Sequence, residues 1–227
     1  MKRTLIFLTI FLVFFISCKK SSSNYDISLY GIFYKDSQAG FSTIYTALYD
    51  VKNSQVISDA SIFLNDQKLN YIHPFYVLEY PYYENKPYNL KLFYGDISES
   101  IDFKTIYLPD TFIIIYPESQ TISLYQDLIV KWKVSQKYTQ TYDYKFVVFF
   151  ENKSKNPTLV YQTDFLPKET DSIVIPGYYI DTKDSRYEIR IFLVNYTILD
   201  KFKPYPGYKF SFIAYGSSTL GVFYTKP

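Results

Sequence analysis

Short runs that alternate apolar and polar residues fill this chain from residue 25 onward, and they limit its folding more than any other feature. The runs are rich in Tyr, Phe, Ile, Val and Thr, and residues such as Asn, Asp, Pro and Lys separate them. Alternation with a period of two, carried by aromatic and β-branched residues, is typical of strands with one buried face. Helical periodicity is hard to find after residue 24. The chain is therefore expected to be all-β.

The expected strands fall into two groups. The first group covers 41–51, 60–64, 75–80, 88–94 and 97–103. The second covers 112–116, 120–124, 128–134, 143–151, 158–165, 172–175, 187–194, 210–215 and 220–224. Gly95-Asp96 is expected to form a hairpin turn. Gly216-Ser217-Ser218 is expected to separate the last two strands, and 105–110 to form an exit strand towards the second group.

A domain boundary is predicted near residue 110. Pro109 and Pro117 bracket the apolar run 112–116, and regularly spaced strands on either side suggest β-sandwiches. The fold expected is two sandwiches, at 25–110 and 111–227. Apolar residues make up 48% of the chain, which excludes global disorder. The chain has one Cys, so no intrachain disulfide can form and each sandwich must be stabilised by its core.

The second half resembles a fibronectin type III domain over residues 111–227. The matching features are a leading Pro117, Trp132 on the second strand, Tyr144 at the start of the third, and the alternating penultimate strand that begins at Tyr187. The segment is longer than the ~100 residues usual for such sandwiches, and 177–184 does not follow the usual link between the fifth and sixth strands. A different Greek-key sandwich is the alternative. The first half, through 59–66 and 87–90, is similar to immunoglobulin-like or transthyretin-like modules.

The N-terminus has the features of an export signal. Lys2 and Arg3 precede an apolar stretch at 5–16, which is too short to span a hydrocarbon layer that needs ~20 residues. Cys18 follows directly. Residues 15–18, Phe-Ile-Ser-Cys, resemble the lipobox of bacterial lipoproteins, with Phe15 in place of the usual Leu. The resemblance implies removal of 1–17 and acylation of Cys18, which would attach the protein to a membrane through lipid.

Residues 18–24 are then expected to form a polar tether, and the protein to lie in the bacterial cell envelope, on the periplasmic side or at the surface. Lys19, rather than Asp, follows the Cys. By the same resemblance this favours the outer membrane if the cell is Gram-negative. Ordinary export, with an incidental Cys or with an uncleaved N-terminal helix, is the alternative interpretation.

The charge balance and the scarcity of residues typical of catalytic sites limit the classes of function that the sequence allows. Without Lys2 and Arg3 the chain has 22 basic and 22 acidic residues, so no basic excess indicates a nucleic-acid partner. His73 is the only His, and it precedes Pro74, which places it in a turn or extended segment. A triad or multi-His metal site cannot form within one chain, and no phosphate-binding or nucleophile motif occurs. No cofactor, no metal and no catalytic activity are predicted.

Two acidic arrangements are the alternatives to that prediction. A calcium site at 181–184 lacks EF-hand spacing, and a polar turn is the simpler interpretation. Carboxylate pairs such as Glu79 with Glu84, or Asp181 with Asp184, cannot be told from solvated turn residues.

A cluster of tyrosines in residues 75–88 is the candidate ligand-binding site. Tyr80, Tyr82, Tyr83 and Tyr88 lie among prolines that favour a loop or a strand edge. Tyr rings on a loop offer an apolar face and a polar hydroxyl, which suit a glycan or a protein partner. A second set lies at Tyr178-Tyr179 and at residues 205–208. General use of Tyr throughout the chain, 27 residues in all, is the competing explanation.

Two functions follow as hypotheses. The first is a membrane-anchored, non-catalytic binding or adhesion module for a protein or glycan, which would show an exposed aromatic patch. The alternative is a structural or accessory subunit of a cell-envelope complex, which would show a free strand edge or a flat apolar face.

Overall fold

A computed structural model describes residues 25–155 and 158–226. The predicted signal peptide, Cys18 and the tether lie outside these residues. The described chain is all-β with several sheets, 55% strand and 4% helix, which confirms the predicted class at this level. No helix in the described part is long and apolar enough to cross a membrane.

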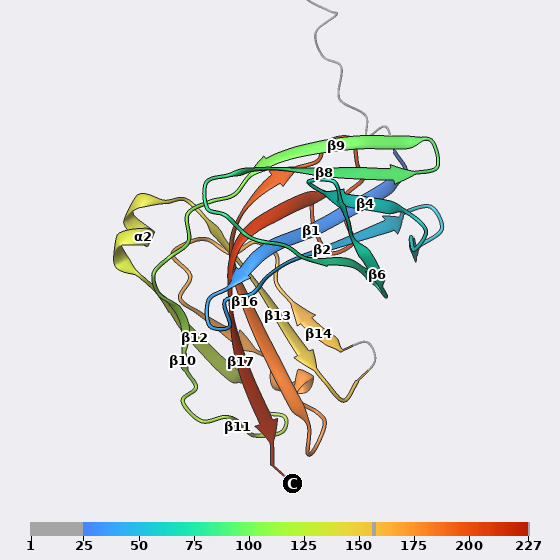
Figure 1. The fold of residues 1–227 in the computed structure, drawn as a ribbon. Coiled ribbons are helices and arrows are strands. Elements are labelled where there is room, and N and C mark those ends of the chain that lie inside the picture. The colour runs from blue at the N-terminus through green and yellow to red at the C-terminus, as the bar shows by residue number, and fades with distance from the viewer. Residues whose placement is uncertain (1–24, 156–157, 227) are drawn as a thin grey trace, which may run out of the picture.

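The strands follow the predicted order closely (Figure 1). The first half contains β1 (Ile27–Asp36), β2 (Ser42–Asp50), β3 (Gln55–Val56), β4 (Ser61–Leu64), β5 (Gln67–Lys68), β6 (Asn70–Ile72), β7 (Phe75–Glu79), β8 (Pro87–Tyr94) and β9 (Ile97–Lys104). The second half contains β10 (Phe112–Tyr116), β11 (Thr121–Ile122), β12 (Leu128–Val134), α2 (Gln136–Thr141), β13 (Lys145–Asn152), β14 (Leu159–Gln162), β15 (Ser172–Ile175), the 3-10 turn η1 (Gly177–Tyr179), β16 (Arg186–Ile198) and β17 (Phe212–Thr225).

Three sheets organise the described residues. The largest runs in the order β14-β13-β16-β17-β1-β2-β7-β6, with β11 and β3 added at its sides. A three-stranded sheet, β10-β12-β15, packs against β13, β16 and β17, and a four-stranded sheet, β5-β4-β8-β9, packs against β1, β2 and β7. Tyr94 pairs with Ile97 across Gly95-Asp96, so the predicted hairpin is confirmed.

The strand β1 is the main element that the alternation pattern missed. It lies in the middle of the large sheet, between β17 and β2, and it pairs with β17 in parallel. Leu29 and Phe33 enter one core, whereas Tyr30, Ile32 and Tyr34 enter the core on the opposite face. A strand buried on both faces reads as a continuous apolar run, so period-two alternation does not reveal it.

Two further expectations were wrong. Residues 105–110 form irregular structure rather than an exit strand. The last two predicted strands are one continuous strand, β17, and Gly216 lies in its interior. A Cβ on Gly216 would lie 1.9 Å from the carbonyl oxygen of Leu193 on β16, so the glycine permits close contact between strands instead of a turn.

Separate domains on either side of residue 110 are not confirmed, because the two halves share one sheet and a core. The first core contains β4, β8 and β9 residues, and it also contains Leu199, Phe202, Ile213 and Tyr215 from the second half. The second core lies under the three-stranded sheet around Trp132. The strands β16 and β17 supply side chains to it and also to the third core, on the opposite face of the large sheet.

Candidate functional site

Several loops lie together at the end of the molecule that holds the C-terminus (Figure 1). The described chain starts at the opposite end, where the Tyr25 N–H donates to the carbonyl oxygen of Lys201. From Phe212 to Thr225, β17 extends about 43 Å at 3.3 Å per residue towards this cluster. We call the cluster the loop end; it consists of residues 123–127, 153–155 and 176–185 with Thr225.

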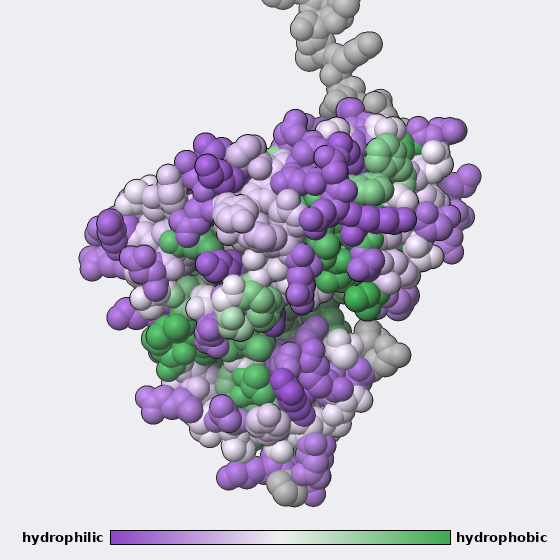
Figure 2. All heavy atoms as spheres, in the orientation of Figure 1, coloured by the Kyte–Doolittle hydropathy of each residue, from purple (hydrophilic) through white to green (hydrophobic). Residues whose placement is uncertain are grey.

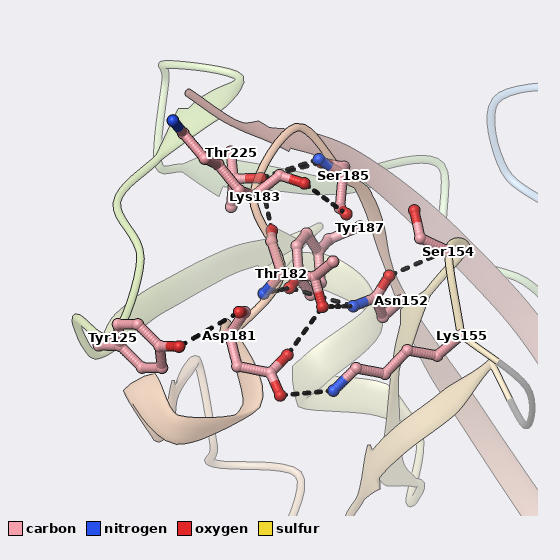
Figure 3. Close-up of polar contacts among 10 residues, drawn as sticks. All are labelled: Tyr125, Asn152, Ser154, Lys155, Asp181, Thr182, Lys183, Ser185, Tyr187 and Thr225. Carbon is pink, nitrogen blue, oxygen red and sulfur yellow. Dashed lines mark hydrogen bonds and ion pairs between the residues drawn. The ribbon is translucent and has the colours of Figure 1, made fainter. Parts of the chain in front are cut away.

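A buried polar network holds the loop end together (Figure 3). Asn152 and Tyr187 are fully buried on neighbouring strands. The Asn152 side-chain amide donates to the Tyr187 hydroxyl at 3.1 Å and to Thr182 Oγ1 at 2.9 Å, and its oxygen accepts from the Ser154 N–H at 2.9 Å. The Thr182 N–H donates to the Tyr187 hydroxyl at 3.0 Å. These bonds satisfy the buried amide and fix the loop that follows residue 180.

Thr225 closes the same loop from the other side. Its hydroxyl donates to the Thr182 carbonyl oxygen at 2.8 Å and accepts from the Ser185 N–H at 2.9 Å. Both bonds are shown in Figure 3. The last turn before β16 is therefore bonded to the end of β17, and the loop is rigid on this side.

Asp181 forms an ion pair with Lys155. Its Oδ2 accepts from Lys155 Nζ at 2.5 Å and its Oδ1 accepts from Thr182 Oγ1 at 3.0 Å. The hydrogen bond from Lys155 lowers the pKa of Asp181 below its usual value, so the carboxylate is ionised at neutral pH. Among the described residues no group of three His, Cys, Asp or Glu side chains lies close enough to hold a metal ion.

Two exposed tyrosines, Tyr125 and Tyr178, lie in the turns of this hydrogen-bonded loop end. Tyr125 and Tyr178 are 69% and 66% exposed, the highest values among the large hydrophobic residues of the described chain. Their turns touch, because a Cβ on Gly177 would lie 2.4 Å from the Tyr125 carbonyl oxygen. Tyr178 packs on Tyr179 with ring centroids 4.3 Å apart, and Tyr179 packs on Tyr161 at 5.1 Å.

The backbone of Tyr125 is strained. Its φ of 56° lies in the left-handed region, where a bulky residue is an outlier. The Tyr125 N–H donates to the Ile180 carbonyl oxygen at 2.9 Å, which holds the turn in place. The Tyr125 hydroxyl donates to the Asp181 carbonyl oxygen at 3.4 Å (Figure 3), so the exposed ring is held against the loop at residues 180–181, a geometry that fixes its position for contact with a ligand.

The tyrosine cluster predicted from residues 75–88 does not form an exposed patch. Tyr82 and Tyr88 are 7% and 3% exposed and lie in the first core, where their rings pack on Phe33. Tyr80 is half-buried against the same core. Tyr83 alone remains on the surface, at 60% exposure. These tyrosines fold inward because they alternate along β8 and its preceding loop with residues that face water.

The second predicted set of tyrosines and His73 also divide into buried and exposed residues. Tyr208 is buried and Tyr205 half-buried, and both pack on Tyr30 in the third core, whereas Tyr178 and Tyr179 belong to the loop end. His73 is exposed in the turn between β6 and β7, as predicted, and its Nδ1 lies 3.0 Å from the Tyr71 hydroxyl. Tyr125 was missed, since nothing in residues 123–127 distinguishes a displayed ring from a buried one.

No protein-family model matches the chain, and no curated protein matches it. Among solved structures, it is similar to the three N-terminal domains of the highly immunogenic outer capsid protein (Hoc) of bacteriophage RB49. That match has a TM-score of 0.29 and 13% identity, and it covers 88% of this chain and 70% of the other. The chain is also similar to trypsin-activated alpha-2-macroglobulin from Escherichia coli, with a TM-score of 0.27 and 9% identity over 76% of this chain and 15% of that one. Scores this low say nothing about function.

Proposed function

We propose that the protein is a non-catalytic binding module of the bacterial cell envelope, held to a membrane by lipid on Cys18, that captures a protein or glycan with its loop end. The observation that carries the proposal is the pair of exposed rings, Tyr125 and Tyr178, on a hydrogen-bonded support far from the start of the described chain. Rigid aromatic side chains supply contact area at low entropic cost, which is why they dominate binding hot spots.

We also propose that residues 111–226 form a fibronectin type III-like sandwich. The three-stranded sheet β10-β12-β15 faces the strands β14-β13-β16-β17, and the order of the strands in the chain supports this topology. Trp132, Tyr144 and Tyr187, which carried the resemblance, are all buried in the core between the sheets. For the first half an immunoglobulin-like sandwich is the corresponding proposal.

Removal of both loop-end rings is expected to abolish capture without unfolding the protein. In a quantitative pull-down from native membranes with the full-length chain, Tyr125→Ala combined with Tyr178→Ala should reduce the captured partner at least about tenfold, because aromatic hot spots are worth about 2 kcal/mol or more. Tyr83→Ala, which removes an equally exposed ring elsewhere, is the matched control and should capture normally. Equal capture by the double variant would contradict the proposal.

The anchor has its own test. Cys18→Ser is expected to move the protein from the detergent phase to the aqueous phase in detergent partitioning, since the acyl chains provide the membrane affinity, ~0.8 kcal/mol for each buried CH₂. The unchanged chain should partition into detergent. Detergent partitioning that does not depend on Cys18 would show that lipid on this residue is not the anchor.

The accessory-subunit function is the second candidate, and a different surface favours it. The outward side of the β10-β12-β15 sheet exposes five large apolar side chains, each 40–49% exposed, and no other described strand joins this sheet. Exposed apolar surface of this kind suits a fixed protein partner.

A further inference from the structure

The outward side of the three-stranded sheet β10-β12-β15 exposes a cluster of apolar side chains. We call it the outer face. Each member is between 40% and 49% exposed; the members are Ile113, Ile115, Tyr116, Ile129 and Val174. The opposite side of the same strands is buried, with Phe112, Val130 and Trp132 at 3% exposure or less. Both sides of this small sheet are therefore rich in apolar residues, and only one side has a covering layer.

Strand register places apolar side chains and lysines next to one another on the outer face. Ile129 pairs directly with Val174 across β12 and β15. Ile113 pairs with Lys133, and Tyr116 pairs with Lys131 after an irregularity in β10. Figure 2 shows hydrophobic surface between charged side chains on the side of the molecule where β10 and β12 lie. Contiguous apolar surface rimmed by polar residues marks interaction sites on soluble domains.

The outer face continues into a hollow. A surface cavity of about 230 Å³ has Tyr116 and Ile129 in its lining, together with Ile122. A neighbouring cavity of about 340 Å³ shares Ile122 and reaches Lys226. The outer face thus borders this shallow hollow at Tyr116 and Ile129.

Two lysines give this surface its charge. Lys131 and Lys133 point outward from β12 and neither forms an ion pair with any residue in 25–155 or 158–226. No acidic residue occupies an outward position on β10, β12 or β15. Four carboxylates flank the strands: Asp127 accepts from the Gly177 N–H, Asp171 accepts from the Ser172 hydroxyl, and Asp110 and Glu118 each lie two residues beyond an end of β10.

These charges decide between occupants. A second copy docked through the same face would bring four lysines together with no carboxylate on the strands between them, which is unfavourable. A glycan would be recognised mainly by aromatic rings, and four of the five apolar members here are aliphatic. The lysines lie two residues apart on one strand, so they repeat at about 6.7 Å, the spacing of alternate side chains in an extended peptide.

We propose that the outer face docks an extended segment of another protein that carries two acidic side chains at alternate positions beside an apolar one. The carboxylates contact Lys131 and Lys133, and the apolar side chain covers Ile129 and Val174. This names the partner chemistry for the accessory-subunit function and rests on it; the loop end takes no part in it.

Peptide binding to the full-length protein in detergent tests the proposal. The probe is a fluorescent peptide with Ile, Glu and Glu at alternate positions between threonines. The control peptide has the same sequence with Lys in place of both Glu residues. The acidic peptide is expected to bind about tenfold more tightly than the basic one, since each exposed ion pair is worth up to about fivefold. K131E combined with K133E should invert that preference, and Ile129→Ser combined with Val174→Ser should weaken both peptides.

The matched control is K68E combined with K104E, which makes the same change in net charge at two exposed lysines of the four-stranded sheet. This variant should keep the preference for the acidic peptide. Equal binding of the two peptides would refute the proposal. So would an inverted preference in the K68E and K104E control, equal to that expected for K131E and K133E.

Vesicles with anionic phosphatidylglycerol are tested in parallel. Lys131-dependent binding to vesicles, without binding to the peptide, would assign the face to lipid instead. The Tyr125 and Tyr178 variant reports on the loop end separately, so the two failures are distinguishable.

Discussion

Gly216→Ala is expected to lower the free energy of unfolding by at least about 3 kcal/mol, an effect at the top of the usual range for overpacking. The new Cβ would lie 1.9 Å from the Leu193 carbonyl oxygen and 2.9 Å from the Cα of Val194. These are backbone atoms of β16, so no side chain can rotate away, and the two longest strands must separate locally. Urea denaturation followed by circular dichroism measures the loss.

Gly221→Ala is the control for Gly216, since it lies in the same strand. There the nearest atoms are the side-chain ends of Ile114, Ile189 and Phe223, at 3.0 to 3.1 Å, which can shift. Its cost should be clearly smaller. If the two variants were equally stable, the close approach of β16 to β17 at residue 216 would be wrong, and a turn at 216–218 would again be the better interpretation.

The alternation of apolar and polar residues predicted most strands of this fold, because it arises where one face of a strand is buried and the other is exposed. In β12 the pattern sends Leu128, Val130 and Trp132 inward and Ile129, Lys131 and Lys133 outward, as the structure shows. The pattern fails where burial is two-sided, as in β1, and where a glycine serves close packing, as at Gly216. In both places the deciding contacts come from strands distant in the sequence, so no short window contains the information.

The candidate site was harder to predict than the fold, for a related reason. The sequence cannot tell which tyrosines of a Tyr-rich chain face solvent, because Tyr suits both a strand core and an exposed loop. Tyr82 and Tyr88 proved to be core residues, and Tyr125, in a short polar segment, is the most exposed tyrosine of the described residues. The support beneath it depends on Asn152, Thr182 and Thr225, which approach one another only in the folded chain.

Tyr88→Ala is expected to destabilise the whole described chain by about 3–5 kcal/mol, the usual cost of removing a buried aromatic ring. Tyr88 is 3% exposed and packs on Phe33 and Phe103, with ring centroids at 4.9 and 5.8 Å. Its hydroxyl donates to the Pro81 carbonyl oxygen at 2.7 Å and accepts from the Tyr83 N–H at 2.8 Å, so truncation also leaves two polar groups without their partner. Tyr83→Ala, in contrast, should change stability by less than about 0.5 kcal/mol.

The same variant shows whether the two halves unfold together. Trp132 is the only Trp and lies in the second core, whereas Tyr88 lies in the first. Because β17 supplies side chains to both cores and pairs with β1 in one sheet, we expect Trp132 fluorescence and far-ultraviolet circular dichroism to shift to the same lower urea midpoint in Tyr88→Ala. A Trp132 transition that stays at the wild-type midpoint would instead show that 111–227 unfolds independently, and the predicted boundary near residue 110 would then separate two true domains.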